Sequence, residues 1–115
     1  MPPQAFDVSG FAGANAGVHI LRVTGAITHS TASVFQEAVC AVASPSLIVD
    51  LSAVPSVDSM AVGALVRAYV SCNKARRRLA LVGLNHRVVN VLRITGVDSL
   101  FDAYPSIPEA ESALG

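Results

Sequence analysis

The fold of this chain is decided by residues 47–63, which have the sequence LIVDLSAVPSVDSMAVG. The run Leu47–Leu51 is apolar apart from one aspartate, which predicts a strand covered on both faces. From Ser59 to about Lys74, apolar residues recur at intervals of three and four, which predicts a helix. The short loop between them places the start of this helix at the carboxyl edge of a sheet, where open α/β folds bind their ligands.

Asp58 and Ser59 stand side by side at this junction between strand and helix. The Asp58 carboxylate can accept a hydrogen bond from the amide of Met60 or Ala61, so we expect it to be the N-cap. Ser59 then takes the first helical position, with its hydroxyl near the surface. The simplest interpretation is a capping pair with no further role. The apolar flank expected to anchor the helix consists of Val62, Leu65, Val66, Tyr69 and Val70.

Strands and helices alternate along the rest of the chain. We expect strands over residues 6–12, 18–23, 47–51, 79–82 and 100–104, and helices over 30–42, 59–74, 85–96 and 109–114. The first two strands form a hairpin, and the other strands are separated by helices. The order β-β-α-β-α-β-α-β-α therefore predicts an α/β fold with a mixed, mostly parallel sheet of about five strands and about four helices.

Local signals add detail to three of the expected helices. Ser33 and Gln36 match a capping box at the start of the first helix, and Gly96 suits a left-handed C-cap after the third. In the terminal helix, which follows Pro108, both glutamates are expected near the positive N-terminal end of the helix dipole. The apolar side of the third helix, which Asn85 would cap, is expected to consist of Val88, Val89, Leu92 and Ile94.

The 115 residues are 52% apolar and 14% charged, which predicts one globular domain over residues 1–115. Eight basic and eight acidic residues cancel, which argues against broad electrostatic binding to nucleic acid or to an anionic membrane. The sequence contains no uncharged apolar run long enough to predict a membrane span. The first residues lack the pattern of a signal peptide. We therefore expect a cytoplasmic protein.

Residues for catalysis or metal binding do not form a recognisable set. The sequence lacks a Gly-x-Ser-x-Gly elbow, a Gly-x-Gly-x-x-Gly motif and a phosphate-binding loop with lysine. His19, His29 and His86 lack metal-ligand spacing, and the only neighbouring base for Ser59 is Asp58, which the cap occupies. We expect no catalytic residue, no metal site and no cofactor, hence no enzyme; a small enzyme that uses Ser59 or a histidine is the minor alternative.

Two other groups of residues have simple interpretations. Lys74–Arg78 carries four cations at the end of the central helix, where they interact favourably with its dipole; a nucleic-acid patch is the alternative. Cys40 and Cys72 fall inside expected helices, where a cysteine is usually a small buried apolar residue; a redox pair is the alternative.

A serine at a helix start can also be a substrate. Phosphorylation of Ser59 would add about −1.5 to −2 charges at the positive end of the helix. The helix dipole favours a phosphate there, while Asp58 repels it, so the fold should survive. The change would therefore act on a partner that docks on this surface.

Residues 47–65 resemble the signature of STAS domains, specifically the bacterial anti-sigma factor antagonists. In that signature an apolar strand ends in Asp-Leu, and after a short loop Asp-Ser leads a helix with glycine four residues after the serine. Further segments similar to the family are Gly25–Thr28, Leu81–Gly83, Val91–Phe101 and Ile107–Ala110.

The resemblance implies a partner and a switch. An antagonist binds an anti-sigma factor, here a serine kinase, which then releases its sigma factor; the kinase phosphorylates the serine after the aspartate, here Ser59, and a serine phosphatase resets it. The partner-binding residues would be Asp58, Ser59, Met60, Val62 and Gly63. We also expect a monomer or weak dimer, and the balanced charge predicts no direct contact with nucleic acid or membrane.

One alternative within the family remains. Met60 and Ala61 stand where the family usually has serine or threonine and then glycine. A STAS-type scaffold or ligand-sensing module without a phosphoswitch would be consistent with these residues.

Overall fold

A computed structural model of the chain describes residues 6–114. The strands are β1 (Asp7–Ala12), β2 (Val18–Thr24), β3 (Ser46–Ala53), β4 (Arg78–Val82) and β5 (Asp102–Tyr104). The helices are α1 (Ala32–Cys40), α2 (Ser59–Lys74), α3 (His86–Ile94) and α4 (Ile107–Leu114), with one 3-10 turn, η1 (Asp98–Leu100). Apart from η1, this is the order that the sequence predicts, and the expected α/β class is confirmed.

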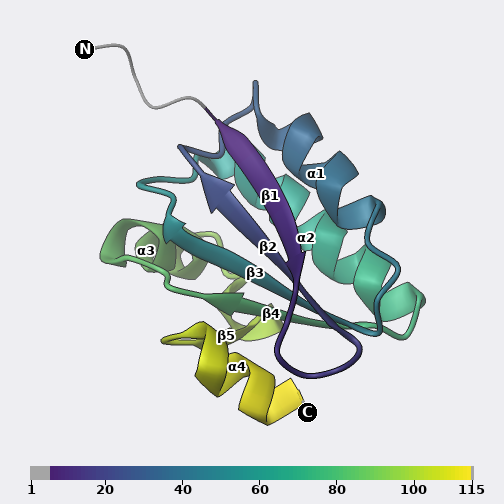
Figure 1. The fold of residues 1–115 in the computed structure, drawn as a ribbon. Helices are drawn as coiled ribbons and strands as arrows, with labels where there is room; N and C mark the ends of the chain where they lie inside the picture. Colours follow the sequence, from purple (N-terminus) through teal and green to yellow (C-terminus); the bar gives the residue numbers. More distant parts are fainter. Residues whose placement is uncertain (1–5, 115) are drawn as a thin grey trace.

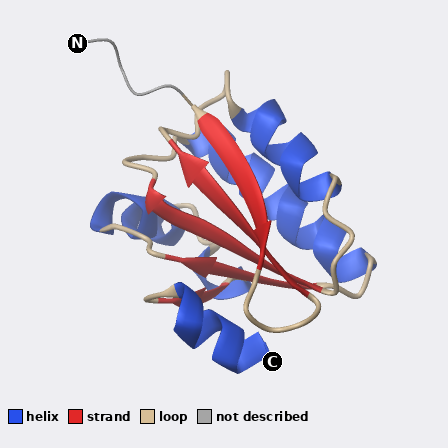
Figure 2. Cartoon of the chain, in the orientation of Figure 1, coloured by secondary structure: helices blue, strands red, loops and turns tan. Residues whose placement is uncertain are grey.

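The five strands form one mixed sheet in the order β1-β2-β3-β4-β5 (Figures 1 and 2). β1 pairs with β2 in antiparallel fashion, and each later pair is parallel. Figure 1 shows α1 and α2 behind the sheet and α4 in front of it. The parallel pairs bring the loops after β2, β3 and β4 to the same edge of the sheet.

Each face of the sheet has its own apolar core. On β2, Leu21 and Val23 belong to the larger core together with buried residues of α1, α2 and α3, whereas Val18 and Ile20 belong to a smaller core under α4. The alternation follows from the two-residue period of a strand. β3 is buried on both faces along most of its length, as its apolar sequence predicts.

The boundaries of α2 agree with the prediction, but its buried face differs from the expected flank. Val62 and Leu65 are buried, yet Val70 is 40% exposed, and the rest of the buried face is made by small residues. The spacing of large apolar residues does not predict this part of the face, because small side chains allow close packing without contributing to that pattern. The small buried residues are Ala61, Ala64, Ala68 and Cys72.

Two expectations for the other helices are wrong. The N-cap of α1 is Thr31, and no side chain caps the helix, so Ser33 and Gln36 do not form a capping box. Ile94, expected on the apolar side of α3, is 75% exposed. It is the last residue of α3, and its position around the helix turns it to solvent. Gly96 does adopt the expected left-handed conformation, with a φ of 76°.

The terminal helix corrects a third expectation. Glu109 lies in the first turn of α4, but Glu111 is buried and accepts a hydrogen bond from the backbone amide of Asn15 at 3.3 Å. Asn15 also donates from its side-chain amide to the carbonyl of Glu111 at 3.2 Å. Glu111 therefore fastens the β1–β2 loop to α4 and does not serve the helix dipole.

The cysteines differ from each other. Cys72 is buried, as expected, whereas Cys40 is exposed. Burial raises the pKa of the Cys72 thiol. Among the helices of residues 6–114, none has both the length and the hydropathy needed to cross a membrane.

Candidate functional site

Two loops meet at the carboxyl edge of the sheet and form the candidate site. The loop after β3 reaches the loop after β2 through a parallel bridge between Val57 and Ile27. The Ile27 amide donates to the carbonyl of Ser56 at 3.1 Å, and the Asp58 amide donates to the carbonyl of Ile27 at 3.2 Å. Val57 and Ile27 are both buried in the larger core. These bonds hold the entry to α2 in a fixed position.

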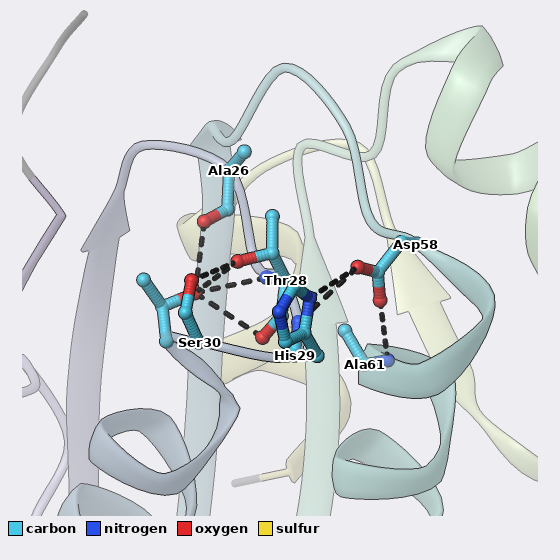
Figure 3. A network of polar contacts seen from close by, with 7 residues as sticks. Ala26, Thr28, His29, Ser30, Asp58 and Ala61 are labelled. Atoms are coloured by element: carbon cyan, nitrogen blue, oxygen red, sulfur yellow. Dashed lines mark hydrogen bonds and ion pairs between the residues drawn. The ribbon is translucent and has the colours of Figure 1, made fainter.

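Asp58 is the N-cap of α2, as the sequence predicts. Its Oδ1 accepts from the Ala61 amide at 2.7 Å, and its Oδ2 accepts from the His29 amide at 3.1 Å (Figure 3). The Nδ1 atom of His29 lies 3.9 Å from the same Oδ2. One carboxylate thus satisfies a free amide of the helix and an amide of the neighbouring loop.

The loop between β2 and α1 is stiffened by hydroxyl groups. Thr31 Oγ1 donates to the carbonyl of Ala26 at 3.0 Å and accepts from the Thr28 amide at 2.8 Å. The hydroxyls of Thr28 and Ser30 are 2.9 Å apart (Figure 3). This loop therefore presents a firm polar surface next to the start of α2.

Ser59 and Met60 are the exposed residues of the first turn of α2. Ser59 occupies the first helical position, and the Met60 side chain is 70% exposed. Gly63 is half-buried. The expectation that Val62 contacts a partner needs correction, because its side chain is 4% exposed and packs in the larger core.

Of the residues expected to bind a partner, the structure thus brings Asp58, Ser59 and Met60 together at the surface, with Gly63 one turn further along α2. His29 joins them, although no local sequence pattern predicts that it belongs to the site. The available signal was topological: the loops after two neighbouring parallel strands meet at one edge.

The chemistry of this site is that of a surface and not of a pocket. Within residues 6–114, no group of three or more His, Cys, Asp or Glu side chains is arranged to hold a metal ion. His29 faces the capping carboxylate of Asp58. The 16 residues of α2 place the positive end of a long helix dipole beside the Ser59 hydroxyl, and this field favours a negative group.

The carboxylate of Asp50 is buried on the α4 side of the sheet. Burial alone would raise the pKa of Asp50, yet hydrogen bonds from the Ser52 amide and hydroxyl, together with Arg22, hold it below its ordinary value. Arg22 Nε lies 3.1 Å from Asp50 Oδ2. With these partners the carboxylate is satisfied, so we interpret this pair as structural.

Comparison with known proteins assigns the fold to a family. Residues 12–110 match the sequence model of the STAS domain. A candidate anti-sigma factor antagonist from Thermotoga neapolitana is 38% identical over 64 residues, which are 56% of this chain and 57% of that protein. The chain thus matches a little over half the length of that relative.

Two solved structures resemble the chain over nearly its whole length. An anti-sigma factor antagonist from Mycobacterium paratuberculosis is 27% identical, with a TM-score of 0.79 and coverage of 93% of each chain. A candidate anti-sigma factor antagonist from Thermotoga maritima is 26% identical, with a TM-score of 0.80 and coverage of 94% of this chain and 92% of the other.

Proposed function

This chain belongs to the STAS domain family, and from that premise we propose that it is an anti-sigma factor antagonist whose activity is switched by phosphorylation of Ser59. As such it binds an anti-sigma factor, which then releases its sigma factor. The similarity to the antagonist from Mycobacterium paratuberculosis, which covers 93% of each chain, supports the role.

The observation that carries the proposal is the exposed Ser59 at the start of a firmly held helix. Asp58 ties this helix start to the neighbouring loop through the amides of Ala61 and His29. A kinase can reach the Ser59 hydroxyl without unfolding the core, because the side chain lies at the surface. The phosphate then adds about two negative charges to a surface that keeps its shape.

The docking surface in this proposal consists of the first turn of α2 and the loop beside it. Met60 supplies apolar area, and the hydroxyls of Thr28 and Ser30 supply polar contacts. A partner whose apolar or acidic groups rest on Ser59 loses affinity when the serine is phosphorylated, since charge is then buried or repelled. In this proposal the anti-sigma factor is itself the serine kinase, and a serine phosphatase restores the unmodified form.

A pull-down from a lysate of the source organism, with and without ATP, tests the proposal. The immobilised chain should capture an anti-sigma factor without ATP and release it with ATP, and the Ser59 peptide should gain one phosphoryl group. Ser59→Ala should capture the partner and fail to release it. Ser59→Glu should bind at least about tenfold more weakly, a loss of about 1.4 kcal/mol.

The matched control is Ser99→Ala, which removes another exposed serine that follows an aspartate. It should capture and release the partner as the parent chain does. Equal binding by the parent, Ser59→Ala and Ser59→Glu would contradict the switch.

A STAS-type scaffold or ligand-sensing module without a phosphoswitch is the second candidate. Met60 favours it, because a side chain that is 70% exposed and apolar beside Ser59 suits permanent contact with a partner. Under this candidate the captured partner stays bound when ATP is added, the mass at Ser59 is unchanged, and Met60→Ser weakens capture more than any change at Ser59.

A further inference from the structure

Ser59 shares a helix face with Arg67, which has no acidic partner among the residues that the structure describes. Ser59, Gly63 and Arg67 are spaced four residues apart along α2, so they lie one above another on one face. The ion pairs among residues 6–114 join Arg22 to Asp50 and His29 to Asp58. Arg67 takes part in neither, and it is exposed.

The Arg67 side chain extends toward Ser59 and lies over Gly63. Its Nη1 atom is 3.3 Å from the position that a Cβ on Gly63 would occupy. Side chains on a helix lean toward its N-terminus, so this direction needs no strain. Because Gly63 carries no side chain, the guanidinium can rest on the helix about 6 Å, one turn, below Ser59.

From this arrangement we propose that Arg67 is the residue that receives the phosphate of phosphorylated Ser59 within the same chain. The inference rests on the proposed function insofar as it assumes that Ser59 is the phosphoacceptor. The distance closes when the phosphoserine side chain turns toward Gly63 and the long Arg67 side chain extends further along the same face. Guanidinium and phosphate form strong charge-assisted hydrogen bonds.

This pairing offsets the repulsion between the phosphate and Asp58. A phosphate on Ser59 lies beside the Asp58 carboxylate, and the two negative groups repel each other. The positive charge of Arg67 offsets that repulsion from the other side. Asp58 can then keep its bonds to Ala61 and His29, so the loop and the helix start remain in place.

The pairing also changes the charge of the docking surface. Before phosphorylation the face of Ser59, Gly63 and Arg67 presents a cation that is unpaired within residues 6–114, which suits an acidic group on a partner. After phosphorylation the cation is engaged within the chain and the face is negative. A partner therefore loses an attractive contact and gains a repulsive one from a single modification.

The test uses the full chain with phosphoserine incorporated at position 59 during translation, so that no kinase is needed. The readout is the second pKa of the phosphate, measured by phosphorus-31 NMR between about pH 4.5 and 8.5 at low salt, around its ordinary value of about 6. A nearby cation favours the dianion and lowers this pKa. Arg67→Gln should raise it by about 0.5–0.8 pH units, as expected for two charges about 4 Å apart in water.

Three further variants make the readout specific. Arg93→Gln removes an exposed arginine from the last turn of α3 and should leave the pKa unchanged. Arg67→Lys keeps the charge and should restore most of the lowering. Gly63→Ala forces the guanidinium to move by a few tenths of an ångström and should give a small rise. For Arg67→Gln, the rise should disappear in about 0.5 M salt, where exposed charges are screened.

The effects of other charged groups at this edge on the phosphate pKa must be distinguished from the effect of Arg67. Asp58 and His29 lie at the helix start, and His86 and Arg87 lie in the first turn of α3, beside Pro55 of the loop after β3. All four charged groups remain in the Arg67 variants, so the difference between parent and variant isolates the guanidinium. A pKa that is equal in the parent and Arg67→Gln, or that rises more in Arg87→Gln, overturns the proposal.

Failure of this inference can be distinguished from failure of the proposed function. If the pKa responds to Arg67 but no partner kinase modifies Ser59, the electrostatic pairing stands and the switch fails. If a kinase modifies Ser59 and releases the chain while the pKa ignores Arg67, the switch stands and this inference fails.

Discussion

The tripeptide Val-Asp-Ser occurs twice in this chain, at residues 57–59 and 97–99, and the two copies have opposite structural roles. The first leads into α2, where the Asp58 carboxylate accepts from the Ala61 and His29 amides. The second follows the end of α3 and enters the three-residue turn η1, which has no side-chain cap. Three identical residues therefore do not by themselves create the candidate site.

The difference comes from the neighbours of each copy. Before the second copy, Gly96 adopts a φ of 76°, its amide donates to Arg93 at 3.1 Å, and the Val97 amide donates to Leu92 at 3.0 Å. This is the Schellman pattern that ends a helix. At the first copy, Asp58 has an extended backbone with a φ of −82° and a ψ of 169°, and the bridge from Val57 to Ile27 holds the chain in place. A helix start needs an extended entry, a cap and an apolar face beyond it.

The largest difference between the copies should appear at their valines. Val57 is 3% exposed in the larger core, so Val57→Ala should lower the free energy of unfolding by about 2–3 kcal/mol, from lost burial and the cavity left behind. Val97 is only partly buried, and Val97→Ala should cost about 1 kcal/mol. Urea unfolding with unchanged m-values measures both. Equal losses would mean that the first loop is no better packed than the second.

The two aspartates should differ in their contribution to the free energy of unfolding, because only Asp58 caps a helix. Asp58→Ala removes the acceptor for the Ala61 and His29 amides and should cost about 1–2 kcal/mol in urea unfolding. Asp98 is exposed at the start of η1, and Asp98→Ala should change the stability by less than about 0.5 kcal/mol.

Asp58→Asn is the matched control for this pair. Asparagine keeps a side-chain oxygen that accepts hydrogen bonds, so most of the stability should return. A cost for Asp98→Ala as large as that for Asp58→Ala would show that the capping bond is not what distinguishes the copies.

The glycine before the second copy should have a smaller effect. A Cβ at Gly96 meets nothing within 4 Å, so Gly96→Ala should cost about 1 kcal/mol through its left-handed backbone alone. Gly63→Ala lies inside α2, where alanine is the better helix former, and should be neutral or slightly stabilising. Thermal unfolding of both variants checks the contrast. A destabilised Gly63→Ala chain would indicate that Arg67 cannot move aside.

These contrasts explain what the sequence could predict. The order of the elements, the bounds of α2 and the caps Asp58 and Asn85 followed from periodicity and local hydrogen-bonding capacity. Both caps have a β-region backbone and a side-chain bond to the third residue after them. Such features depend on a few consecutive residues, which is why local patterns suffice.

The features that the sequence did not predict depend on contacts between distant segments. His29 bonds to a carboxylate 29 residues away, and Glu111 bonds to Asn15 across 96 residues. The partner surface implied by the family resemblance includes Val62, although the helical spacing of this residue also predicts a place on the apolar flank. Its burial follows from the position of α2 on the sheet, which only the packed fold defines.

The smallest effects on stability should come from the two serines, and they matter most for the proposed function. Ser59 and Ser99 are both exposed, so Ser59→Ala and Ser99→Ala should each change the free energy of unfolding by less than about 0.5 kcal/mol. Urea unfolding of the two variants beside the parent provides the measurement. A serine that contributes nothing to the fold can be modified freely, and a loss of binding on modification then belongs to the interface. A cost above about 1 kcal/mol for Ser59→Ala alone would make the hydroxyl a structural group, and a phosphate on it would disturb the start of α2 before it reached any partner.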